Sequence, residues 1–268
     1  YAIDLTGRVA VVTGGYGVLG AGMAEALAAA GAKVALLGRN AAAAGARAEA
    51  LRAAGADAMT LIADVLDEVA LKAARTQLLK AWGRVDILVN AAGGNVARAR
   101  TDKTPVFDMP FDAFDEVVRL NLQGTVYPTL VFGEAMAEAG RGSIVNISSM
   151  AAMQALSGAP GYSAAKAAID NFTKWMAVDL ARRHSAGLRV NAIAPGFFVT
   201  EQNRALLVQP DGAFTERAQA ILRKTPMGRF GEPAELQGIV VWLCSDAASF
   251  VTGAVIPVDG GFGAFSGL

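Results

Sequence analysis

The sequence predicts a single α/β domain in which helices cover both faces of a doubly wound parallel sheet. Short apolar runs alternate with longer segments of helical periodicity over all 268 residues. The apolar runs are nearly continuous rather than alternating with polar residues, which is typical of parallel strands buried on both faces. No Pro/Ser-rich linker, low-complexity tract or repeat divides the chain, so we expect one domain over residues 1–268.

Two patterns give the order of the elements. Apolar runs predict strands over residues 8–13, 33–37, 58–62, 85–89, 143–147, 188–193 and 255–258. Apolar residues at helical spacing predict helices over residues 18–30, 40–54, 67–82, 111–139 and 162–182. Gly31 stops the first helix, and Asn40 is a suitable N-cap for the second. Residues 202–230 hold two prolines and few strand signals, so we expect a small inserted helical lid there.

The composition excludes several classes of protein. The chain has 24 Lys+Arg and 24 Asp+Glu, whereas a protein that binds nucleic acid needs a basic face. Cys244 and His184 are single residues of their kinds, which excludes an internal disulfide and a Cys/His zinc site. No apolar run approaches the ~18 residues of a membrane helix, and residues 1–7 carry no secretory signal. We therefore expect a cytoplasmic protein that acts on a small molecule, without a nucleic acid, a membrane or a metal as partner.

A glycine-rich turn joins the first predicted strand to the first helix. Gly15, Gly17 and Gly20 fit the pattern G-x-G-x-x-G. In this place the pattern favours a Rossmann-type dinucleotide site, because bare backbone lets a pyrophosphate approach the helix N-terminus. The alternative is a turn that needs glycine for steric reasons alone. The cofactor contacts predicted here are Gly14, Gly15, Tyr16, Gly17, Val18, Leu19 and Gly20.

The residues after the second strand bear on the choice of cofactor. A carboxylate there would bind the ribose hydroxyls of NAD, and an arginine suits the 2′-phosphate of NADP. The sequence has Arg39 and Asn40 and no carboxylate, which favours NADP and leaves NAD as the alternative. Arg39 could instead stack on adenine or be an ordinary solvated residue. Asp64 and Val65 are predicted at the adenine, and a helix N-terminal charge is the other interpretation of Asp64.

Tyr162 and Lys166 are separated by one helical turn at the start of a predicted helix. Residues at i and i+4 share a helix face, so the phenol and the ammonium can meet over a common site. A free tyrosine has a pKa of about 10, and a nearby cation lowers it toward the range useful for proton exchange at neutral pH. This spacing is common by chance, so its meaning depends on the other motifs.

Several motifs in one consistent order give the chain a family resemblance. Along nearly its full length the chain resembles the short-chain dehydrogenase/reductase family. The residues that carry the resemblance are Thr13, Gly14, Gly20, Asn90, Ala91, Ala92, Gly93, Asn121, Ser149, Tyr162, Lys166, Pro195, Gly196 and Thr200. It implies hydride transfer between a nicotinamide and a carbonyl or alcohol, and it implies a homotetramer.

The resemblance also implies a role for each of four residues. Tyr162 would exchange a proton with the carbonyl or alcohol oxygen, and Ser149 would hydrogen-bond that oxygen. Lys166 would hold the nicotinamide ribose and lower the pKa of Tyr162, and Asn121 would keep a water near Lys166. Ser148 should point the other way in a strand, which favours Ser149. The further cofactor contacts that the resemblance implies are Asn90, Ala91, Ala92, Gly93, Pro195, Gly196, Phe198 and Thr200.

Two positions depart from the family pattern. Val18 stands where the family usually has glycine, and Gly17 supplies a glycine one position earlier. A β-branched residue resists positive φ, so we expect a slightly rebuilt turn that keeps its backbone donors. Ala91 stands where asparagine is commoner after Asn90. Neither change touches the four residues with implied catalytic roles.

The substrate is expected from the loops around this site. The polar run at residues 201–204 suits a polyhydroxylated ligand, and Arg204 could pair with a carboxylate. A solvated start of the lid or a helix cap is the alternative for this run. The loops resemble a subgroup of the family assigned to sugar acids, the D-mannonate oxidoreductases (fructuronate reductases), which interconvert D-fructuronate and D-mannonate. The predicted substrate contacts are Gly94, Asn95, Ser149, Met150 and Arg204.

Three other functions stay open at this point. A 3-oxoacyl-acyl-carrier-protein reductase would want a basic docking patch, for which Arg98, Arg100 and Lys103 are sparse candidates. A gluconate 5-dehydrogenase-like enzyme would act on a related sugar acid. A non-catalytic dinucleotide-binding sensor is the alternative from a different class, and the intact Ser, Tyr and Lys set argues against it.

Overall fold

Seven parallel strands form one sheet in the order β3-β2-β1-β4-β5-β6-β7. The computed structural model describes residues 3–102, 104–200 and 203–267. Its strands are β1 Val9–Thr13, β2 Lys33–Gly38, β3 Ala58–Ile62, β4 Ile87–Asn90, β5 Gly142–Ile147, β6 Leu188–Pro195 and β7 Val255–Val258. The strand order reverses between β1 and β4, and open sheets of this kind bind ligands at such a point. The predicted fold class is confirmed.

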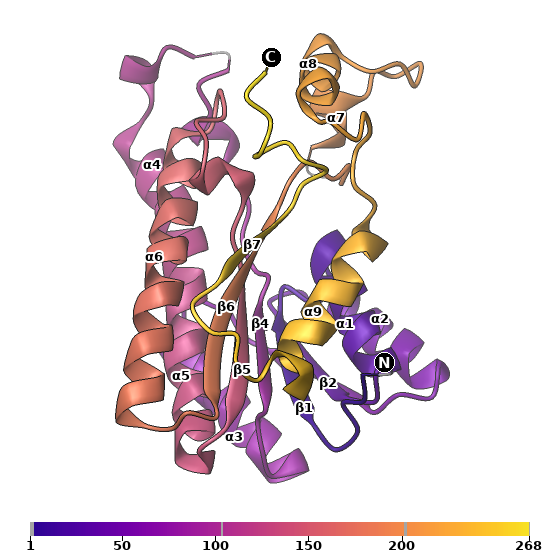
Figure 1. Cartoon of the computed structure of the whole chain (residues 1–268), viewed down its shortest axis with the longest axis vertical. Coiled ribbons are helices and arrows are strands. Elements are labelled where there is room, and N and C mark those ends of the chain that lie inside the picture. Colours follow the sequence, from indigo (N-terminus) through magenta and orange to yellow (C-terminus); the bar gives the residue numbers. More distant parts are fainter. Residues whose placement is uncertain (1–2, 103, 201–202, 268) are drawn as a thin grey trace.

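Helices cover both faces of the sheet (Figure 1). On one face lie α1 Val18–Ala29, α2 Ala41–Ala53 and α9 Gln237–Cys244. On the other lie α3 Glu68–Trp82, α5 Gly124–Ala139 and α6 Pro160–Arg183. The remaining helices, α4 Phe111–Val118, α7 Arg204–Leu207 and α8 Glu216–Lys224, lie toward the carboxyl ends of the strands. Short 3₁₀ helices are η1 Ala97–Ala99, η2 Val106–Asp108, η4 Met150–Ala152, η5 Pro233–Leu236 and η6 Asp246–Ala248.

The continuous apolar strands are explained by two separate cores. Along β1, Ala10 and Val12 belong to the core with α1 and α9, whereas Val9 and Val11 belong to the core with α3, α5 and α6. Successive side chains of a strand point to opposite faces, so every position of β1 is buried in one core or the other. A parallel sheet covered on both faces therefore leaves no solvent face on which polar residues could alternate.

The helix predicted over residues 111–139 is wrong in one respect, because it is interrupted. After α4, a π-helical turn spans Arg119–Gln123, and α5 begins at Gly124. The Asn121 amide group donates to the Val117 carbonyl at 2.8 Å and to the Gly94 carbonyl at 2.7 Å. Apolar periodicity carries no signal for one extra residue in a helical turn, although such turns occur frequently at functional sites.

The predicted lid region contains two helices, α7 and α8, within residues 203–230. Leu207, Ala218 and Ile221 form a small core of their own, against which Phe197 and Phe230 pack. Glu201 and Gln202, at the start of this segment, and Tyr1 and Ala2, at the start of the chain, lie outside the described residues. The helical content agrees with the expectation, and the role as a lid stays a prediction. In the described part of the chain, no helix is long and apolar enough to cross a membrane.

Arg189 on β6 fastens the end of α9 to the sheet. Its side chain is buried, and the guanidinium donates to the Leu243 carbonyl at 2.8 Å and to the Ser245 carbonyl at 3.0 Å. The Ser143 hydroxyl donates to the same Leu243 carbonyl at 2.9 Å. The last carbonyls of a helix have no partner within it, and Arg189 gives two of them a charged donor in addition to the Ser143 hydroxyl at Leu243 and the Ala248 N–H at Ser245.

We expect Arg189→Met to lower the free energy of unfolding by about 2 kcal/mol, because two charge-assisted hydrogen bonds in a buried place are lost. Urea denaturation measures this change. Arg183→Met is the control, because the Arg183–Asp179 ion pair leaves the arginine largely exposed and such a pair contributes less than about 1 kcal/mol. Equal effects of the two substitutions would contradict the capping role of Arg189.

Candidate active site

A cavity of 530 Å³ opens at the carboxyl ends of the strands, where the strand order reverses. Its volume lies within the range of about 300–1,000 Å³ that is usual for small-molecule and cofactor sites. The predicted residues that line it are Gly14, Tyr16, Gly17, Val18, Leu19, Gly20, Arg39, Asp64, Val65, Ala91, Ala92, Gly93, Gly94, Asn95, Ser149, Tyr162, Lys166, Pro195, Gly196, Phe198 and Thr200. The structure thus brings together segments that are far apart in the sequence.

The glycine-rich turn is bare where it faces the cavity. Gly14 has φ +64°, and a side chain on Gly20 would place its Cβ only 2.4 Å from the Gly14 carbonyl oxygen. Gly17 is extended and forms the N-cap of α1, so Val18 is the first helical residue and needs no positive φ. The helix N-terminus is therefore open to an anion. A dinucleotide pyrophosphate fits this cradle.

The other end of the turn forms a flat surface beside Arg39. The Tyr16 ring packs against Gly38 so closely that a Cβ at Gly38 would lie 2.1 Å from the ring. The Arg39 guanidinium forms an ion pair with Asp64, with 3.5 Å between the Arg39 Nη1 and Asp64 Oδ2 atoms. The other Asp64 oxygen accepts from the Leu66 backbone N–H at 2.9 Å. Arg39 is largely exposed, so a ligand phosphate can compete with Asp64 for it.

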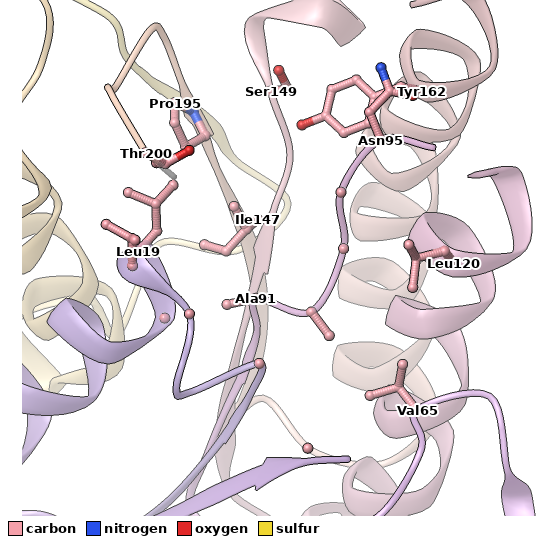
Figure 2. A pocket seen from close by; sticks show the side chains of 18 of the residues that line it. Leu19, Val65, Ala91, Asn95, Leu120, Ile147, Ser149, Tyr162, Pro195 and Thr200 are labelled. Carbon is pink, nitrogen blue, oxygen red and sulfur yellow. The ribbon is translucent and has the colours of Figure 1, made fainter. Parts of the chain in front are cut away.

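Tyr162 and Lys166 lie one turn apart at the N-terminal end of α6. Figure 2 shows the Tyr162 hydroxyl directed into the cavity below Ser149, with Pro195 and Thr200 on the opposite wall. The Lys166 ammonium donates to the Ile147 carbonyl at 2.7 Å and lies 5.4 Å from the centre of the Tyr162 ring. Ser149 is extended, and its hydroxyl accepts from the Ala151 backbone N–H at 3.1 Å. These three side chains face one space, as the sequence predicts.

Burial controls the proton affinity of both groups. It raises the pKa of the Tyr162 phenol, and the nearby Ser149 hydroxyl opposes that rise. It also lowers the pKa of Lys166 to about 8, and Asp170 opposes that fall. The sequence predicts a lowered pKa for Tyr162, and the structure shows the reverse. Loss of hydration is the largest influence on the phenol. The Lys166 ammonium donates to the Ile147 carbonyl.

Asn121 lies behind the cavity wall rather than on it. Its side chain is fully buried in the π-helical turn, where it accepts from the Gly94 backbone N–H at 3.1 Å. A Cβ on Gly93 would lie 2.7 Å from the Asn121 side-chain oxygen. Asn121 therefore holds the backbone of residues 93–94 in place, and that backbone lines the cavity.

Several predicted contacts are not among the residues that line the cavity. Gly15 packs on Leu36, Asn40 caps α2 by accepting from Ala43, and Met150 is buried below Phe262. Asn90 is buried in the core, where its amide group donates to Thr129 and to Asn146, each at 2.9 Å. Arg204 is exposed at the first turn of α7. In each case the sequence identifies a segment beside the cavity, but it does not show whether the residue itself faces the cavity.

Asn203 belongs to the polar run at residues 201–204, from which the sequence singles out Arg204 and not Asn203 as a contact. Asn203 accepts from the Thr200 backbone N–H and donates to the Phe198 carbonyl, each at 2.7 Å, so it holds the loop that Thr200 and Phe198 belong to. The cavity is also lined by Gly38, Ala63, Leu66, Leu120, Ile147, Ser148 and Phe197. A polar residue three positions after Thr200 is the available signal for Asn203, and the apolar residues have none.

The fold and the cavity together define a class: an α/β protein with a dinucleotide cradle at the carboxyl ends of its strands. A family model described as enoyl-(acyl carrier protein) reductase matches residues 17–263. An uncharacterized oxidoreductase of Bacillus subtilis (strain 168) is 46% identical over 275 residues, which cover 99% of this chain and 98% of that protein. The chain therefore belongs to the short-chain dehydrogenase/reductase family and is an oxidoreductase.

Two solved structures are similar over nearly the whole chain. A putative D-mannonate oxidoreductase from Haemophilus influenza with bound NAD has a TM-score of 0.94 and 41% identity, over 99% of this chain and 98% of that one. A gluconate 5-dehydrogenase from Burkholderia cenocepacia J2315 in complex with NADP and tartrate has a TM-score of 0.88 and 33% identity, over 98% of each chain. Their agreement with this chain extends from the sheet to the helices around the cavity.

Proposed function

We propose that the protein is a nicotinamide-dependent reductase of a sugar acid that interconverts D-fructuronate and D-mannonate. One observation carries the reaction class: Ser149, Tyr162 and Lys166 face the same cavity that the glycine-rich turn opens. The bare cradle suits a dinucleotide pyrophosphate, and the two solved relatives hold NAD and NADP. A dinucleotide-binding sensor would have no use for this arrangement.

In the proposed mechanism, bound reduced nicotinamide supplies the hydride to the carbonyl carbon. The Tyr162 hydroxyl donates its proton to the carbonyl oxygen, and the Ser149 hydroxyl hydrogen-bonds the same oxygen as negative charge develops on it. The raised pKa of Tyr162 keeps the phenol protonated at neutral pH, which is the form that reduction needs. Lys166 binds the cofactor ribose and stabilises the phenolate left behind. Asn121 acts by holding the backbone at residues 93–94.

The choice of a sugar acid rests on the family resemblance and on the two similar structures, whose names both specify such substrates. The cavity wall agrees with a polyhydroxylated ligand, because the polar residues Asn95, Ser149 and Asn203 line the same cavity as Tyr162. Gly94 and Asn95 remain proposed substrate contacts. Arg204 has no part in this proposal, because its side chain is exposed and is not among the lining residues.

The 3-oxoacyl-acyl-carrier-protein reductase alternative is supported by a relative of that name, which is 36% identical over 259 residues. The proposed docking cations weaken it, because Arg98 already pairs with Asp112 and Glu116. Arg100 likewise pairs with Asp102 at 2.8 Å. Lys103 lies outside the described residues. We therefore place the acyl carrier substrate second.

We expect the purified enzyme to oxidise NADPH or NADH faster with D-fructuronate than with 5-ketogluconate or an acetoacetyl thioester, measured as kcat/KM from absorbance at steady state. Tyr162→Phe should lower kcat by about 10³-fold, because it removes the proton donor. The Kd of NADPH, measured by fluorescence, should stay unchanged in this variant.

Three results of this screen would contradict the proposal in different ways. A preference for the acetoacetyl thioester would select the acyl carrier alternative. Substantial turnover by Tyr162→Phe would remove Tyr162 from the mechanism. Tight binding of NADPH with no turnover of any of the three carbonyl compounds would favour the sensor.

We also propose that NADP is preferred over NAD, with Arg39 as the residue that binds the 2′-phosphate. The exposed guanidinium stands at the adenosine end of the cavity and exchanges its ion pair with Asp64 for the phosphate.

Arg39→Ala should therefore raise the Kd of NADPH by about tenfold or more, through loss of a charge-assisted interaction, and should leave that of NADH nearly unchanged. Titration of protein fluorescence with each cofactor measures both constants. Arg47→Ala removes a comparable exposed arginine, which pairs with Glu25, and is the control. An unchanged NADPH-to-NADH ratio in Arg39→Ala would contradict the preference.

The assembly and the compartment complete the proposal: a homotetramer, as the family resemblance implies, in the cytoplasm, as the sequence predicts. Exposed apolar side chains on α5 and α6, namely Leu130, Trp175 and Val178, supply a face that a second copy would cover. Light scattering should give four times the chain mass of 27.5 kDa, and Trp175→Glu should lower it. A single-chain mass for the unaltered protein would contradict the tetramer.

A further inference from the structure

A strip of four ionisable residues runs along α6 from the cavity to the surface. Tyr162, Lys166, Asp170 and Lys174 follow one another at intervals of four residues. Each interval rotates the side chains by about 40° around the helix, so the strip leaves the site gradually. Tyr162 and Lys166 line the cavity, Asp170 is half-buried, and Lys174 is exposed.

Lys166 occupies a place in which its positive charge is poorly supported. The side chain is 4% exposed, and its hydrogen bond of 2.7 Å goes to a neutral carbonyl, that of Ile147. Burial lowers the pKa of Lys166 to about 8, and Asp170 is the charged group that opposes this effect. Lys166 therefore loses its positive charge above about pH 8, and without Asp170 it would lose that charge at a lower pH.

Asp170 lies one helical turn after Lys166 on α6 and is half-buried. Burial raises the pKa of the Asp170 carboxyl group, and the Ser148 hydroxyl, which is 2% exposed, opposes that rise together with Lys174 and Lys166. Among the residues that the structure describes, Asp170 Oδ1 and Ser148 Oγ are buried without a hydrogen-bond partner of good geometry. None of the ion pairs formed by the described residues includes Asp170. An unpaired carboxylate in surroundings of low polarity acts strongly on the nearest buried cation.

The charged groups on the elements packed against α6 are directed elsewhere. On α4, Asp112 and Glu116 pair with Arg98 at the surface, and Asp115 is exposed. Arg119 of the π-helical turn is exposed, and Arg189 of β6 donates to the end of α9. The turn η4 carries no charged residue. Tyr162 is thus the other titratable group beside Lys166.

We propose that Asp170 is a positioning residue of the reaction, which supports the positive charge of Lys166 beside Tyr162, and that Ser148 opposes the protonation of Asp170. This inference rests on the proposed role of Lys166. Removing the carboxylate leaves burial to act alone, so the pKa of Lys166 falls further and the ammonium loses its proton at a lower pH. The effect is confined to the alkaline side, because Lys166 is protonated at acid pH with or without Asp170.

The charge of Lys166 can be measured without any substrate. The chain has seven lysines, so the ¹³Cε signal of Lys166 is identified in labelled protein as the one missing from Lys166→Arg. We expect a titration midpoint that falls by about one pH unit in Asp170→Asn and stays near the original value in Asp170→Glu. Asp170→Ser, a smaller neutral variant, should give the same fall and replaces Asp170→Asn if that protein does not fold. Asp179→Asn removes the same charge from the same helix near its far end and should have no effect.

Kinetics connects this charge to the reaction. With D-fructuronate and NADPH, kcat of Asp170→Asn should fall roughly tenfold relative to the unaltered enzyme at about pH 9 and match it at about pH 6. KM for D-fructuronate should not change, whereas a merely structural role would lower kcat at every pH. An unchanged Lys166 midpoint in both neutral variants overturns the inference. Absence of D-fructuronate turnover by the unaltered enzyme contradicts the proposed function and leaves the titration as the test of Asp170.

Discussion

A chain of buried hydrogen bonds beneath the cavity fixes where the site residues lie. Asn90 of β4 donates to Asn146 of β5 and to Thr129 of α5, and Asn146 donates to Thr173 of α6, each at 2.9 Å. All four side chains are buried, so breaking one bond leaves its partner without hydration. Apolar contacts allow two elements to slide past each other, whereas a hydrogen bond fixes the distance and direction between its two groups. These bonds therefore fix the position of α6 relative to the end of β5.

In the site above these hydrogen bonds, burial has opposite effects on two pKa values. Removing water favours the neutral form of any group, so it raises the pKa of the Tyr162 phenol and lowers that of the Lys166 ammonium. The first effect holds the proton that reduction consumes. The second effect favours loss of the proton from Lys166, whose positive charge stabilises the phenolate once Tyr162 has donated its proton. A reductase with this architecture benefits from a carboxylate behind the lysine, and α6 carries Asp170 one turn further on.

The sequence predicts the fold well because the inner strands are buried on both faces and appear as nearly continuous apolar runs. It also predicts which segments form the cavity wall, since glycine and polar motifs mark the ends of those strands. It does not predict which way a side chain turns within a loop: Asn203 faces the site and neighbouring Arg204 faces solvent. The direction of the Tyr162 pKa shift was likewise beyond reach, because it depends on burial by segments distant in the chain.

The π-helical turn at Arg119–Gln123 has a consequence for the second half of its long helix. One additional residue in a turn advances the following helix by about 100° around its axis. The stripe of α5 that packs on the sheet, including Val131, Phe132 and Met136, is therefore set relative to α4 by that residue. Deleting a residue from the turn would straighten the helix and rotate this stripe off the sheet. The π-helical turn that brings Asn121 against the 93–94 backbone therefore also determines which side of α5 faces the sheet.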